Sequence, residues 1–222
     1  MSAVAEPLTA GVGICLDPAA LSTLLEPDCA AAVWQREMSV DVQSWLASLP
    51  ADSLPRGRVV APVQTVGTII EQLFEMAGAP RGIERDWLTA DIVELAELFA
   101  EVVSAKYLRV RLDVITTNAC RRFHVDAITA RLVCTYRGTG TQYGVCEGEG
   151  DPARIETVAT GAPILLRGTR WPAGEAPKVL HRSPPIEGTG EIRLVLVLDP
   201  VAVPDELDVY DAQSLANIGT LN

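Results

Sequence analysis

Apolar residues recur at helical spacing through most of the first half of the chain. Asp17 and Pro18 form a cap and a first turn, which predicts a helix from there to about residue 25 after a loose lead-in over residues 1–16. Further helices are predicted from about Val40 to Pro50, over 66–76 and over 87–103. The last of these has an acidic side that we expect to face water, formed by Asp91, Glu94, Glu97 and Glu101.

The period changes after Lys106, where apolar and polar residues alternate as in a half-buried strand from Tyr107 to Ile115. Short strands are also predicted at 131–136, 155–158, 163–166 and 193–198, with Gly and Pro between them, and another at Val59–Val60 within the helical half. Helices followed by short strands predict an α+β fold, with N-terminal helices packed on a C-terminal double-stranded β-helix, the cupin-like jelly roll.

These patterns divide the chain into three parts that we expect to form one integrated domain. They are an N-terminal helical region at 1–105, a jelly-roll core at 106–200 and a C-terminal tail at 201–222, with a short helix around Ala212–Ala216. A chain of 222 residues is long enough to bury a sizeable core.

Composition removes several classes of partner. The net charge of −11 argues against nucleic acid and against anionic membranes. Five cysteines without a CxxC pair, no secretory leader and no run long enough to span a bilayer predict a cytoplasmic protein with reduced thiols. Six arginines near the first histidine indicate either attraction of a small anion or solvated strand edges: Arg109, Arg111, Arg121, Arg122, Arg131 and Arg137.

The chain contains only two histidines, and the first is followed two residues later by a carboxylate. On an extended segment, His124 and Asp126 point to the same side while Val125 points away. With His181 from a distant strand they would form the two-histidine, one-carboxylate face that suits Fe(II) and also holds Zn, Mn or Ni. Cys120, four residues before His124, is a further thiol that could approach such a metal.

Each of these residues also has an ordinary structural explanation. Either histidine could be an imidazole bonded to a backbone carbonyl, and Asp126 could cap a loop. Arg193, twelve residues after His181, is another candidate for the site, but it could equally be a charge at a strand edge. The aromatic residues Trp87, Tyr143 and Trp171 could line a substrate pocket, but aromatics are more often part of the core.

Three segments, at 160–168, 179–186 and 190–196, resemble the C-terminal half of Fe(II)/2-oxoglutarate-dependent oxygenases. The chain also resembles a bacterial family of unknown function that carries Phe-His-x-Asp and His-Arg-Ser-Pro-Pro signatures and is often encoded beside zinc-homeostasis genes. The resemblance covers residues 106–199. It implies Fe(II) and 2-oxoglutarate as cofactors, with a metal held by His124, Asp126 and His181.

The same resemblance implies that Arg193 anchors 2-oxoglutarate, with Asn118 and Tyr136 as further co-substrate contacts. Such an enzyme would hydroxylate or demethylate a small molecule or a protein that the sequence does not identify. Two departures keep a non-catalytic Zn-binding protein open as the alternative. Gly161-Ala162 stands where the family has Gly-Asp, and the predicted jelly roll is short for eight strands. A metal-free interaction module is the second alternative.

Overall fold

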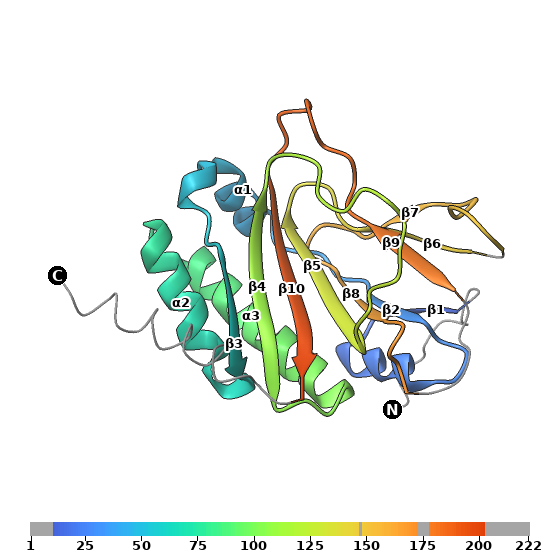
Figure 1. Cartoon of the computed structure of the whole chain (residues 1–222). Coiled ribbons are helices and arrows are strands. Elements are labelled where there is room, and N and C mark those ends of the chain that lie inside the picture. Colours follow the sequence, from blue (N-terminus) through green and yellow to red (C-terminus); the bar gives the residue numbers. More distant parts are fainter. Residues whose placement is uncertain (1–10, 147, 173–177, 203–222) are drawn as a thin grey trace.

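A computed structural model describes residues 11–146, 148–172 and 178–202, and shows two facing β-sheets with helices on one outer side (Figure 1). The larger sheet has seven strands, in the order β1 (Val12–Cys15), β2 (Ala31–Trp34), β8 (Pro163–Arg167), β5 (Ala130–Arg137), β10 (Arg193–Val201), β4 (Tyr107–Ile115) and β3 (Gly57–Pro62). The smaller sheet has β7 (Glu156–Thr157), β6 (Gln142–Val145) and β9 (Val179–Arg182). The helices are α1 (Val40–Ser48), α2 (Val66–Ala77) and α3 (Ile83–Val102), with 3-10 turns η1 (Pro18–Leu25), η2 (Ala51–Ser53) and η3 (Val63–Thr65).

From β4 onward the chain passes back and forth between the two sheets. β4, β5, β8 and β10 lie in the larger sheet, and β6, β7 and β9 lie in the smaller one. A single antiparallel bridge between His124 and His181 adds the β4–β5 connection to the edge of β9. This is the path of a jelly roll in which one strand of the smaller sheet is reduced to a single bridged residue.

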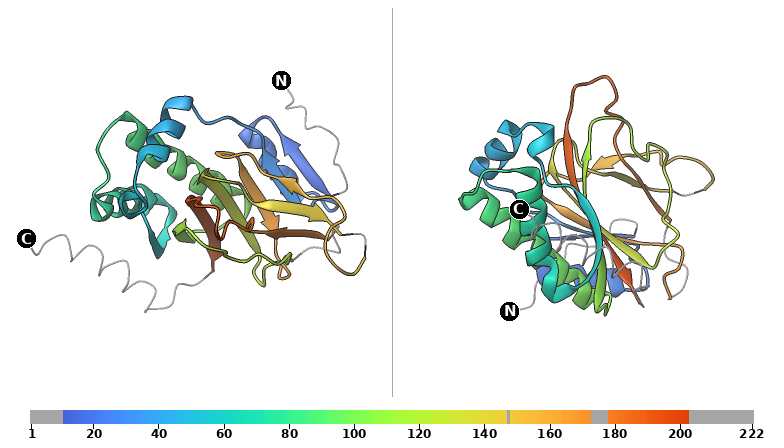
Figure 2. Two further views of the ribbon diagram at one scale, coloured as in Figure 1. Left: turned by 90° about the horizontal axis from the view of Figure 1, so that it is seen from above. Right: turned by 60° about the vertical axis from the view of Figure 1, so that its left-hand side comes forward.

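The larger sheet separates two sets of side chains because successive residues of a strand point to opposite faces. On β10, Leu194, Leu196 and Leu198 are fully buried under the helices, in one core with Phe74 and Phe99. Burying each such leucine contributes about 1.5–3 kcal/mol. The intervening residues Val195 and Val197 belong to a second core cluster and line a cavity on the other face of the sheet. Figure 2 shows that α1, α2 and α3 all lie on one side of the larger sheet.

The helical layer follows the sequence closely. α1 begins after Ser39, whose hydroxyl accepts a hydrogen bond from the Val42 amide. α2 ends at Gly78, which adopts the left-handed φ of 64° that glycine tolerates best at a helix end. The predicted helix over 87–103 is present as α3, which begins earlier, at Ile83.

The N-terminal region differs from the prediction in its strands. Val12–Cys15, expected in a loose lead-in, forms β1, and Ala31–Trp34, for which no element was predicted, forms β2. The predicted strand at Val59–Val60 is the centre of β3. The described part of the N-terminal region, residues 11–105, therefore adds three strands to the sheet of the jelly roll, and the two regions share one core.

The acidic side of α3 is only partly in water, which corrects one expectation. Glu94, Glu97 and Glu101 are exposed, but Asp91 is buried. Its carboxylate pairs with Arg36 at 2.5 and 2.7 Å and accepts a hydrogen bond of 2.6 Å from the Tyr136 hydroxyl. The prediction that Asp91 faces water was wrong because its partners, Arg36 and Tyr136, come from distant segments. The periodicity of α3 carries no information about those segments.

Two further predictions fall at the C-terminal end. β10 continues to Val201, and the predicted helix around 212–216 lies outside the described residues. Among the helices that the structure describes, none has the length and apolar character needed to cross a membrane.

Candidate metal centre

The two histidines are brought together by their own backbones. The His124 amide donates to the His181 carbonyl at 3.1 Å, and the His181 amide donates to the His124 carbonyl at 3.0 Å. Residues that exchange both bonds in this way lie directly opposite each other and carry their side chains on the same face. The imidazole centroids are accordingly 4.5 Å apart.

Asp126 is held beside them by a close contact between two loops. The amides of Gly168, Thr169 and Arg170 donate to the carbonyls of Thr129, Asp126 and Ile128, respectively, at 2.8 to 3.0 Å. A side chain at Gly168 would not fit, because a Cβ atom there would lie 2.0 Å from the Ile128 oxygen and 2.8 Å from the Asp126 oxygen. The glycine therefore permits the backbone approach that places Asp126 at the histidines.

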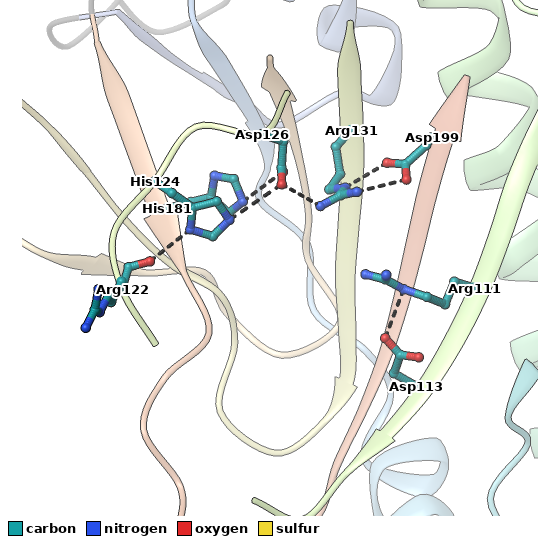
Figure 3. Close-up of polar contacts among 8 residues, drawn as sticks. All are labelled: Arg111, Asp113, Arg122, His124, Asp126, Arg131, His181 and Asp199. Carbon is teal, nitrogen blue, oxygen red and sulfur yellow. Dashed lines mark hydrogen bonds and ion pairs between the residues drawn. The ribbon is translucent and has the colours of Figure 1, made fainter. Parts of the chain in front are cut away.

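The three side chains converge on one point (Figure 3). Asp126 Oδ2 lies 3.1 Å from His181 Nε2, and Asp126 Oδ1 lies 3.5 Å from His124 Nε2. All three ligand atoms lie within 4.8 Å of one another. Adjacent ligands of an ion with bonds near 2.1 Å are about 3 Å apart, so the spacing suits a shared cation.

The donor set also fits a divalent ion chemically. Asp126 Oδ2 is buried and accepts no hydrogen bond from any residue that the structure describes. An oxygen in that condition is costly unless a cation or a donor satisfies it. Two imidazole nitrogens and one carboxylate on a common face are the ligand set of non-haem iron sites, and they also accept zinc.

Protonation at neutral pH favours metal binding. Burial lowers the pKa of His181 below its ordinary 6.5, although Asp126 opposes this shift. Burial alone would raise the pKa of Asp126, but His181, Arg131 and His124 together lower it to about 2. His124 Nδ1 lies 2.8 Å from the Arg122 carbonyl and donates to it, which leaves Nε2 as the ring nitrogen that faces the site.

The two histidines and a buried arginine line the same small cavity. The cavity has a volume of about 90 Å³ and is lined by His124, His181 and Arg193 among other residues. A single water needs about 10–15 Å³ by the same kind of measure, so the space can hold a larger guest. Ser183, from the segment between β9 and β10, also reaches it.

Arg193 itself is 1% exposed, and its three hydrogen bonds are to neutral oxygens. Nε donates to the Thr139 carbonyl at 2.7 Å, Nη1 to Ser183 Oγ and Nη2 to Thr135 Oγ1, both at 3.3 Å. Among the described residues no carboxylate lies within ion-pair distance of it. Burial lowers its pKa to about 10, only partly offset by Glu191. A cation buried without a counter-charge favours an anionic ligand.

Two other residues predicted as co-substrate contacts lie elsewhere. Tyr136 points from β5 into the helical core, on the opposite face from the cavity, where its hydroxyl binds Asp91. Asn118 joins two loops, because Oδ1 accepts from the amides of Ile186 and Glu187 and Nδ2 donates to the Glu187 carboxylate. Both have structural partners, and the structure does not bring either to the metal ligands.

The arginine cluster near the first histidine has several destinations. Arg137 donates to the carbonyls of Leu46 and Leu49 at the end of α1, and Arg111 forms an ion pair with Asp113. Arg131 contacts Asp126 directly. Cys120 also lines the cavity, but its thiol is not within the 4.8 Å group of ligand atoms.

Two residues that position the site were not singled out as site residues by the sequence. Arg131 appeared only as one member of a basic cluster, and Gly168 only as the end of a strand that resembled a known family. The sequence does show Arg131 as a charge at the start of one predicted strand and Gly168 as a glycine just after another. Neither signal says which distant residue is the partner.

Comparison with known proteins adds a family and remote structural neighbours. A family model described as "Protein of unknown function (DUF1826)" matches residues 16–199. No curated protein matches the sequence.

Solved structures share limited sequence with this chain. A Pseudomonas putida prolyl-4-hydroxylase is 13% identical over 85% of this chain and 100% of its own, with a TM-score of 0.44. A dioxygenase for auxin oxidation in rice is 15% identical over 85% and 79%, with a TM-score of 0.47. AviO1 from Streptomyces viridochromogenes Tue57 is 16% identical over 86% and 98%, with a TM-score of 0.42. None of these scores reaches 0.5, so function has to be inferred from the side chains.

Proposed function

The chain belongs to the DUF1826 family of proteins of unknown function, and we propose that it is a non-haem Fe(II) dioxygenase that uses 2-oxoglutarate. It would hydroxylate or demethylate a substrate that remains to be found. One observation carries the proposal. Two histidines converge with an aspartate, and both histidines line a cavity that is also lined by a buried arginine without a carboxylate partner among the described residues.

The ligand set supports iron because it occupies one face of the ion and leaves the remaining positions to small molecules. His124 Nε2, His181 Nε2 and Asp126 would hold the ion, and the Arg122 carbonyl would keep the His124 ring in the required tautomer. When bound, Fe(II) supplies the electrons for reductive activation of dioxygen, coupled to decarboxylation of 2-oxoglutarate to succinate.

Arg193 supports the choice of co-substrate. Its guanidinium makes three hydrogen bonds to neutral oxygens and has no carboxylate of the described residues within ion-pair distance, and the residue lines the cavity. The fork of an arginine binds a carboxylate through two parallel hydrogen bonds. A dicarboxylate with a keto acid at one end would then contact the metal and the arginine at the same time. The apolar walls formed by Val133, Val195 and Val197 would exclude water between them.

An anaerobic titration tests the proposal. Addition of Fe(II) and 2-oxoglutarate to metal-free protein should produce the weak visible charge-transfer band of a chelated keto acid. His124→Ala should lose the band. Absence of the band in the parent protein, together with unchanged metal binding in His124→Ala, would refute the proposed function.

Zinc binding without catalysis is the alternative that the same ligands support. Metal analysis of protein purified without chelators distinguishes the two, combined with an assay for succinate release. Stoichiometric zinc with no succinate would favour a Zn-binding protein connected with metal homeostasis. Iron-dependent succinate release would favour the dioxygenase.

A further inference from the structure

We propose that Arg131 is a positioning residue that restricts Asp126 to binding the metal through a single oxygen. The inference rests on the proposed metal site and concerns a residue that touches a ligand rather than the ion. Arg131 is the second residue of β5 and reaches Asp126 in the preceding loop (Figure 3).

The contacts of Arg131 divide its guanidinium between two carboxylates. Nε and Nη2 donate to the two oxygens of Asp199 at 2.7 and 2.8 Å, which fixes the plane of the group. The remaining nitrogen, Nη1, lies 2.8 Å from Asp126 Oδ1. The three side chains are between 8% and 17% exposed, so water competes little for these contacts.

The two oxygens of Asp126 therefore have different roles. Oδ1 is engaged by Arg131 at 2.8 Å and lies 3.5 Å from His124 Nε2, whereas Oδ2 is buried without a hydrogen bond and lies closer to a ligand nitrogen, 3.1 Å from His181 Nε2. A carboxylate that is free to turn can chelate a metal with both oxygens. Holding Oδ1 aside leaves Oδ2 as the ligand atom.

This restriction matters for the number of open positions. An octahedral ion held by two histidines and one carboxylate oxygen keeps three positions free, as the facial arrangement requires. A bidentate keto acid and dioxygen together need all three. A chelating Asp126 would take one of them, so Arg131 preserves the vacancy that the proposed reaction uses.

Because Asp199 neutralises Arg131, we expect Arg131 to act on Asp126 through geometry rather than through net charge. Asp199 lies on β10, is buried, and balances the positive charge of Arg131. The pair Arg131–Asp199 is neutral as a unit. Replacing both partners by uncharged residues of similar shape therefore removes the hold on Asp126 while leaving the net charge near the metal unchanged.

The experiment uses the full chain with Co(II) as a spectroscopic probe and compares the parent protein with Arg131→Gln/Asp199→Asn. We expect Co(II) affinity to fall about 10–100-fold, the usual effect of losing a partner of a ligand. The visible d–d bands should also change in intensity, because their strength depends on the number of ligands. A merely structural role would change neither the band shape nor the band intensity of the saturated protein.

A matched control is available beside the site. Arg111 and Asp113 line the same cavity and form another arginine–aspartate pair, 2.9 Å apart, but their ion pair does not involve a metal ligand. Arg111→Gln/Asp113→Asn should bind Co(II) like the parent protein. An equal loss of Co(II) affinity in this control would show that removing any arginine–aspartate pair between the sheets weakens metal binding. That result would overturn the role assigned to Arg131.

Folding is checked by circular dichroism. If the Arg131→Gln/Asp199→Asn protein does not fold, Arg131→Lys decides, because lysine keeps the charge but cannot form the two-sided fork. Parent-like affinity and spectrum in whichever variant folds would overturn the inference. A parent protein that binds no Co(II) would instead remove the metal site and the proposed function with it.

Discussion

His124 and His181 exchange both backbone hydrogen bonds although they lie on different segments of the jelly roll. This single bridge is all that the structure has of the fourth strand of the smaller sheet. Its effect is local and strong, since it aligns two imidazoles whose centroids are 4.5 Å apart. The metal centre thus depends on main-chain pairing before it depends on any side-chain contact.

Replacing either histidine should abolish metal-dependent stabilisation. A ligand that binds only the folded protein raises its free energy of unfolding by about 2.7 kcal/mol at one hundred times the dissociation constant. His124→Ala and His181→Ala should lose most of this gain while keeping their fold, because the backbone bridge does not require the rings. Thermal denaturation with and without Fe(II), Co(II) or Zn(II) measures this stabilisation by the metal. Equal stabilisation of parent and variants would contradict the assignment of the ligands.

Gly168→Ala should disturb the site through the backbone. The added Cβ would meet the Ile128 oxygen at 2.0 Å, and neither main chain can move without breaking the hydrogen bonds between the loops. We expect destabilisation of about 1–3 kcal/mol, as for other overpacked positions, together with weaker metal binding.

Gly148→Ala is the control, because nothing lies within 4 Å of the position of its Cβ and its φ is not in the left-handed region. It should resemble the parent in chemical denaturation and metal titration. Similar behaviour of the two alanine variants would show that close approach at Gly168 does not hold Asp126.

Arg193→Met should separate co-substrate binding from metal binding. The variant should bind Fe(II) like the parent, but 2-oxoglutarate should no longer raise its melting temperature in the presence of metal. Loss of three hydrogen bonds, worth about 1 kcal/mol each, is offset by removal of a buried charge that burial makes unfavourable. The metal-free variant should therefore unfold within about 1 kcal/mol of the parent. A 2-oxoglutarate response equal to that of the parent would exclude Arg193 as the anchor.

Tyr136→Phe tests the location of that side chain. The substitution removes the hydroxyl that donates to Asp91 at 2.6 Å in the helical core, so the free energy of unfolding should fall by about 1–2 kcal/mol. The affinity for 2-oxoglutarate should stay unchanged, because Tyr136 lies on the face of β5 away from the cavity. Calorimetric titration of the metal-loaded protein measures the affinity. A large loss of affinity for 2-oxoglutarate would show that Tyr136 does contact the co-substrate.

Local pattern was sufficient for much of the fold. The spacing of apolar residues predicted α1, α2 and α3, and alternation predicted β4, because each of these elements buries one face more than the other. Short apolar runs separated by Gly and Pro predicted β5, β8 and β10, which are buried along most of their length. Local pattern missed β1, β2 and β6, four residues each, which are too short to show a period.

The sequence by itself determined which residue types were available for the chemistry, since the chain contains two histidines and one of them has a carboxylate two positions away. Only the tertiary structure decided that His181 pairs with His124, that Arg131 engages Asp126, and that Tyr136 faces the helices. The physical reason is that periodicity reports how a residue faces its own element. Which distant strand supplies its partner is fixed by sheet order and register, and these arise from packing of the whole chain.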